Sequence, residues 1–121
     1  MQYQPSAEDL LAAIAELLDD KLLPALPDAL RHECRVAANL ARILERQERL
    51  GPDAAARERE RLRALLGGED EGAVALAARL ASRIRADDDP GFQRQAWDAL
   101  VAIARDDLAI AKPGHDAWEG I

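Results

Sequence analysis

A long stretch without glycine or proline, residues 28–50, constrains this chain more than any other feature. Pro27 precedes it and suits the first position of a helix, where its missing N–H group costs nothing. Gly51 and Pro52 follow it and predict a helix end, because glycine is favoured just past a helix and proline cannot continue one. The stretch therefore predicts a helix over residues 27–50, on the order of 35 Å long at about 1.5 Å per residue.

The apolar residues of this predicted helix spread over about half of its circumference, at about 100° per residue. That arc is wider than the stripe of an ordinary surface helix, so we expect neighbouring helices on two or three sides. One side of the arc holds Leu26, Leu30, Cys34, Ala37, Ala41 and Leu44. The adjoining side holds Val36, Leu40, Ile43 and Leu50.

A polar stripe borders the arc, because Asp28, His32, Arg35 and Asn39 follow one another at spacings of four, three and four. One interpretation is a solvated edge with local pairing, such as Asp28 with His32. The other is a partly buried polar network that binds a ligand or orders a partner surface, since a buried Asn39 would need hydrogen-bond partners.

Four further helical segments are predicted from capping residues, apolar periodicity and the Gly and Pro positions that separate them. We expect a compact all-α bundle of four or five helices, forming a single domain over residues 1–113 with a C-terminal tail over 114–121 that carries Trp118. The helices over residues 6–23, 27–50 and 90–112 should form the core. The charged helix over 54–66 should be peripheral. The remaining helix should span residues 73–86.

Charge and composition exclude several classes of protein. The net charge is −7 and the pI about 4.8, so no nucleic-acid or anionic-membrane partner is expected. No apolar run approaches the length of a transmembrane helix, and no signal peptide is visible. Cys34 is the only cysteine, which is typical of a buried small residue in a cytoplasmic protein.

Motifs for metal, cofactor or nucleophile chemistry are missing from the sequence. It contains no HExxH, no paired CxxC and no GxSxG, so we expect no metal, no cofactor and no catalytic residue, and we favour a protein that is not an enzyme. In the helix over residues 90–112, Asp107 should project into the apolar arc and Asp106 to the opposite side. An exposed Asp107 at a frayed helix end is the alternative.

Two functional hypotheses follow from these residues. The first is an accessory or protein-interaction domain, which binds a partner or a second copy through an apolar patch beside Arg35 and Asn39. The second is a pocket between the helices over 27–50 and 90–112 for an anionic small molecule, whether bound or chemically transformed. Trp97 would form its wall, and the polar groups would come from His32, Arg35, Asn39 and either Asp106 or Asp107.

Three segments resemble a bacterial family, the domain of unknown function numbered 6285. They are PSAEDLLAAIAELLDDKLLPAL at residues 5–26, RVAANLARILERQE at 35–48 and RDDLAIAKP at 105–113. The resemblance implies a short helical protein without an assigned activity, encoded near aminoglycoside-phosphotransferase-like kinases and acyl-CoA dehydrogenases. It therefore implies an accessory role with such a kinase or dehydrogenase as partner.

Overall fold

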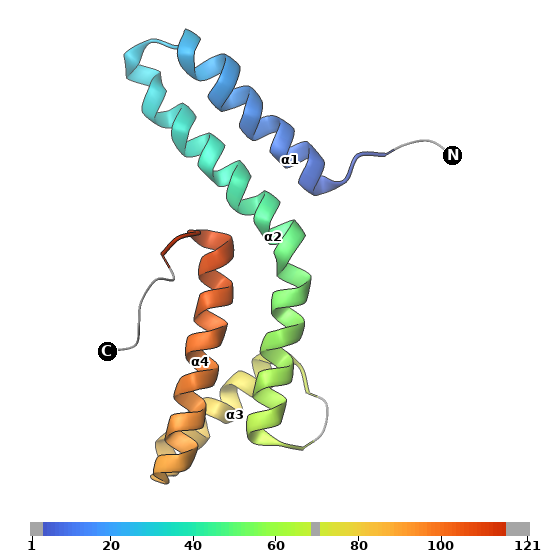
Figure 1. Ribbon diagram of the computed structural model, residues 1–121, viewed down its shortest axis with the longest axis vertical. Helices are drawn as coiled ribbons and strands as arrows, with labels where there is room; N and C mark the ends of the chain where they lie inside the picture. The colour runs from blue at the N-terminus through green and yellow to red at the C-terminus, as the bar shows by residue number, and fades with distance from the viewer. Residues whose placement is uncertain (1–3, 69–70, 116–121) are drawn as a thin grey trace. The chain divides into compact units, whose positions relative to one another are not determined.

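The computed structural model describes residues 4–68 and 71–115, and these residues form helices without any strand. In chain order they are α1 (Ala7–Glu16), the π-helix η1 (Leu17–Leu22), the 3₁₀ helix η2 (Leu23–Ala25), α2 (Asp28–Leu66), α3 (Ala73–Ala86) and α4 (Pro90–Ala111) (Figure 1). The predicted all-α class is confirmed, and the α-helices of the described residues agree in number with the lower end of the prediction.

Contacts divide the chain into two compact units. Of the described residues, unit 1 comprises 4–51 and 110–112, and unit 2 comprises 52–68, 71–109 and 113–115. The single domain over residues 1–113 stays a prediction. Trp118, in the predicted tail, lies outside the described residues.

The predicted helix end at Gly51 and Pro52 was wrong, because α2 continues through both residues to Leu66. Proline disfavours helix in the residue before it partly through a clash with that residue's Cβ, and Gly51 has none. Gly51 is buried, and a Cβ added there would collide with the side chain of Gln47. Glycine thus allows a proline inside the helix, and residues 54–66 are the second half of α2.

The predicted helix over residues 6–23 is present as three successive segments. The Ser6 side chain accepts a hydrogen bond from the Asp9 N–H at 3.1 Å and caps α1, as its sequence position predicts. After Glu16 the chain widens into η1, where the Cys34 thiol donates to the Leu18 carbonyl at 3.2 Å. η2 then leads into the corner before α2.

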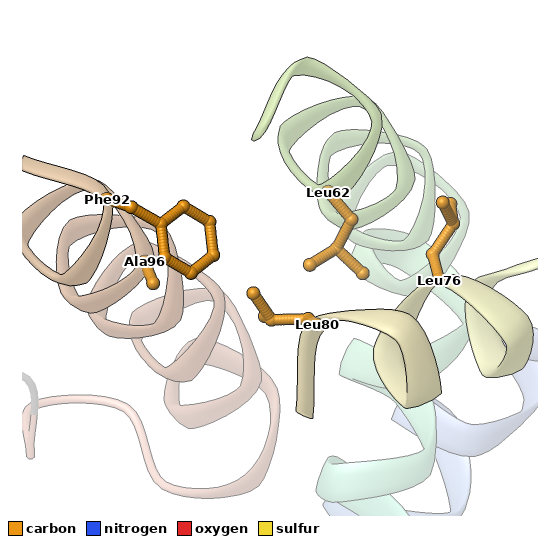
Figure 2. Packing of buried hydrophobic residues seen from close by; sticks show 5 residues of the cluster. All are labelled: Leu62, Leu76, Leu80, Phe92 and Ala96. Atoms are coloured by element: carbon orange, nitrogen blue, oxygen red, sulfur yellow. The ribbon is translucent and has the colours of Figure 1, made fainter. Parts of the chain in front are cut away.

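The largest buried cluster lies within unit 2 and joins the second half of α2 to α3 and α4. In Figure 2 its side chains point toward one another between the three helices; they are Leu62, Leu76, Leu80, Phe92 and Ala96. The prediction of a peripheral helix over residues 54–66 was wrong, since Leu62 is only 2% exposed. Its charged residues occupy the other faces, which leaves one apolar face for this core. The expected core of the helices over 6–23, 27–50 and 90–112 is corrected accordingly.

Truncation of Leu62 tests this core. We expect Leu62→Ala to lower the free energy of unfolding by about 2–4 kcal/mol, because it removes buried apolar atoms from the cluster and leaves a cavity. Val74→Ala, at a side chain that is 87% exposed, should change it by less than about 0.5 kcal/mol. Urea denaturation measures both values. Equal effects of the two changes would contradict the described core.

Candidate functional site

The residues of the predicted pocket are distributed over both units. His32, Arg35 and Asn39 lie on α2 within unit 1 and are exposed. Trp97, which is 51% exposed, lies with Asp106 and Asp107 on α4 within unit 2. Their convergence on one pocket stays a prediction.

Asp106 has the most specific polar environment of these residues. Its Oδ2 atom accepts hydrogen bonds from Arg57 Nε at 3.1 Å and from Arg61 Nη1 at 2.8 Å, all within unit 2. These bonds, that from Arg57 foremost, hold the pKa of the Asp106 carboxyl below its ordinary value. Asp106 therefore ties α4 to the second half of α2, and both its arginine partners are already engaged.

The predicted orientations of Asp106 and Asp107 were reversed. Asp106 is partly buried, whereas Asp107 is exposed, which confirms the alternative stated for Asp107. The inward face of α4 runs through Phe92, Ala96 and Ile103, and Asp106 follows Ile103 by three residues on the same face. The arginines at positions 57 and 61 were the missed signal, because the helix over residues 54–66 that carries them was expected to be peripheral.

Unit 1 is a helical hairpin in which most of the large apolar side chains lie outside the contact between its two helices. α1 and the first half of α2 lie side by side in opposite directions (Figure 1). The buried residues between them are small: Ala15, Cys34, Ala38 and Ala41. The apolar face consists of side chains that are each 43–54% exposed: Leu10, Ile14, Leu17, Leu30, Val36, Leu40 and Leu44.

Helical geometry places both halves of the apolar face on one side of the hairpin. At about 100° per residue, the exposed side chains of each helix centre roughly a third of a turn from the buried small residues. In both helices this offset has the same sign when residues are counted from N to C. Antiparallel helices wind in opposite senses when viewed from one end, so offsets of equal sign meet on the same side. The apolar face is therefore continuous across α1 and α2.

The opposite side of the hairpin is polar. Asp19 and Arg42 form an ion pair there between η1 and α2, and Arg46 donates to the Ile110 carbonyl at 2.7 Å within unit 1. The same rotation places Arg35 and Asn39 on this side, away from the apolar face. The hairpin is thus amphipathic as a whole, and its charged groups do not interrupt the central part of the apolar face.

Unit 2 contains an apolar slot with a volume of about 220 Å³ between α3, α4 and the second half of α2. Its lining is aliphatic except for one carboxylate, and consists of Glu58, Leu62, Ala77, Leu80, Ala81, Ile84, Leu100 and Ile103. Among the described residues, Glu58 has no ion-pair partner. The slot can therefore accept an aliphatic group, with Glu58 available to a hydrogen-bond donor.

A second, wider hollow beside α3 has a volume of about 530 Å³ and contains Arg79 and Arg83. Arg79 is bound to the Glu71 carboxylate at 2.8 Å, and the Arg83 guanidinium lies 3.9 Å from the centre of the Phe92 ring. Because both cations already have partners, this hollow is a poor anion site.

Within residues 4–68 and 71–115, no three His, Cys, Asp or Glu side chains gather closely enough to hold a metal ion. Over those ranges no helix combines the length and apolar character needed to cross a bilayer. Cys34 is a buried free cysteine, as predicted.

Comparison with known proteins gives one match. The model of a family described as a domain of unknown function (DUF6285) matches residues 24–115, which is more than half of the chain. The match includes two of the three segments quoted for the resemblance, and only the end of the first. No curated protein and no solved structure matches the chain.

Replacement of Asp106 tests its role in joining α4 to α2. The pKa of the Asp106 carboxyl is lower in the folded protein than its ordinary value of about 3.9. The ionised carboxylate therefore stabilises the fold fully at pH values above the ordinary pKa, and this stabilisation is lost as the pH falls through the folded-state pKa. We expect Asp106→Asn to lower the free energy of unfolding by about 1 kcal/mol near neutral pH. The difference from wild type should shrink below about pH 4.

Urea denaturation at neutral and acidic pH measures this difference. Asp107→Asn is the matched control and should have little effect at either pH, because its side chain is exposed. A larger effect at Asp107 than at Asp106 would contradict the described orientation of α4.

Proposed function

The chain belongs to the family described as a domain of unknown function (DUF6285), and from that premise we propose that it is a non-enzymatic accessory protein that binds another protein surface. The observation that carries this proposal is the apolar face of unit 1. Among the described residues of unit 1 no helix covers this face, since its side chains are each 43–54% exposed.

The size of the apolar face supports a protein partner. A half-exposed side chain of leucine size leaves roughly 80–90 Å² in contact with water, so the whole face amounts to roughly 600 Å². Monomeric proteins rarely expose larger continuous apolar patches than this, and such patches mark interaction sites. At about 25 cal/mol per Å², its burial would contribute on the order of 15 kcal/mol before the costs of association.

The polar groups of the chain favour binding over catalysis. Asp106 carries the carboxylate with a lowered pKa, and its hydrogen bonds to Arg57 and Arg61 use it for structure. The slot in unit 2 is aliphatic with one carboxylate, and so lacks a second group for acid–base exchange. These features suit a protein that acts by association.

The family resemblance supplies candidate partners, namely a phosphotransferase-like kinase and an acyl-CoA dehydrogenase. Co-expression of the chain with each candidate, followed by affinity purification, tests whether they bind. A candidate that binds the apolar face should co-purify with wild type and be lost with Leu40→Glu, because a charge would have to be buried at the centre of that face.

Val74→Glu is the control for this experiment, since it places the same charge on an exposed apolar position outside the face. It should co-purify as wild type does. If neither candidate binds wild type and the chain does not self-associate, the proposed accessory role fails.

A second candidate function is small-molecule binding, and the slot in unit 2 favours it. This slot is a different site from the predicted anionic-ligand pocket beside Arg35 and Asn39, and its Glu58 carboxylate favours an aliphatic chain that ends in a cation or a hydrogen-bond donor. A volume of about 220 Å³ suits a short chain of this kind.

Titration with decylamine and with decanoate tests this second function. We expect decylamine alone to raise the melting temperature, and Glu58→Gln to reduce the effect several-fold by removing the carboxylate. Stabilisation by decanoate alone would instead support the anionic ligand. An absence of any shift would remove the slot as a binding site.

A further inference from the structure

We infer that the partner on the apolar face is a second copy of this chain, so that two hairpins pack face to face as a four-helix assembly. This inference rests on the proposed interaction role and names the surface that covers the face. It concerns α1 and the first half of α2, both in unit 1.

The form of the face favours self-association. Both of its halves lie on one side of a two-helix layer, and the stable way to bury such a layer is against a second layer of secondary structure. A twofold axis through the face brings the same residues of both copies together, as in the common dimers of soluble proteins. Exposed alanines beside the leucines, Ala13 and Ala37, allow the helices of the two copies to approach closely.

The area of the face agrees with that of a stable dimer. Two copies of roughly 600 Å² would bury about 1,200 Å² in total, which reaches the lower end of standard specific interfaces. The contact would be mainly aliphatic, with Glu33 of α2 on the same side toward the hairpin's closed end. Interfaces between identical subunits are likewise more apolar than other protein interfaces.

The charge distribution of unit 1 also favours a second copy of the chain over a partner that is attracted to the face by opposite charge. The ion pair of Asp19 with Arg42 and the side chains of Arg35 and Asn39 lie on the other side of the hairpin. The central part of the face, from Ala37 to Leu44 on α2, presents no charge that would select an oppositely charged surface. Each chain carries a net charge of −7, so salt should strengthen the association of two copies by screening their repulsion.

Sedimentation equilibrium over a wide range of concentrations tests the inference, with far-UV circular dichroism to verify that each variant is helical. We expect wild type to dimerise reversibly and more tightly at high salt. Leu40→Glu and Ile14→Glu, one on each helix of the face, should each weaken dimerisation on the order of a hundredfold or more, because each dimer would bury two carboxylates. Val74→Glu should dimerise as wild type does.

Other outcomes overturn the inference in distinguishable ways. A wild-type monomer at every concentration would overturn it. If that monomer still bound the kinase-like protein through Leu40, the proposed interaction role would stand with a different partner. A monomer that bound neither candidate, and whose stability fell on Leu40→Glu, would mean that unit 2 of the same chain covers the face, and both proposals would fail. A dimer that tolerated both glutamates would place the interface elsewhere and also overturn the inference.

Discussion

The buried side chains of the α1–α2 hairpin are small, and the rest of unit 1 depends on this constraint. Ala15, Cys34, Ala38 and Ala41 are buried there, whereas most of the larger apolar side chains of the two helices are not. Those larger side chains lie at about half exposure along one side of the hairpin, while the ion pair of Asp19 with Arg42 lies on the other. Two helices cannot bury such a face by themselves, because burial requires a second layer. The proposed function follows from that requirement.

Unit 2 differs because three helices enclose their own core. Leu62, Leu76 and Phe92 come from α2, α3 and α4 and are each at most 4% exposed. The hydrogen bonds of Asp106 with Arg57 and Arg61 join two of these helices beside the core. The core of unit 2 is thus covered by the unit's own side chains, and the aliphatic slot next to Glu58 opens beside it. This contrast is the reason to place the interaction surface on unit 1.

The sequence predicts the helices well where a residue that caps or ends a helix has only one structural interpretation. Ser6 before α1 is such a case, as is Pro90 at the first position of α4. Gly51 and Pro52 are not such a case, because they allow two structures. Glycine commonly ends a helix, but a glycine before a proline also lacks the Cβ that would clash with the proline ring inside a helix. The side of α4 that holds Asp106 could not be fixed from its own periodicity, since apolar residues cover too much of that helix. The arginines that decide it, Arg57 and Arg61, are 49 and 45 residues away from Asp106 in sequence, and such pairings depend on tertiary structure.

Amide hydrogen exchange at several protein concentrations tests the central claim, that the hairpin of unit 1 is incomplete until another copy covers it. The account predicts that amides of α1 and of the first half of α2 exchange more slowly as the concentration rises, because association opposes their local opening. Amides of α3, in the closed core of unit 2, should exchange at a constant rate. Slow exchange of α1 that does not change with concentration would show a hairpin that is stable alone, and would contradict the account.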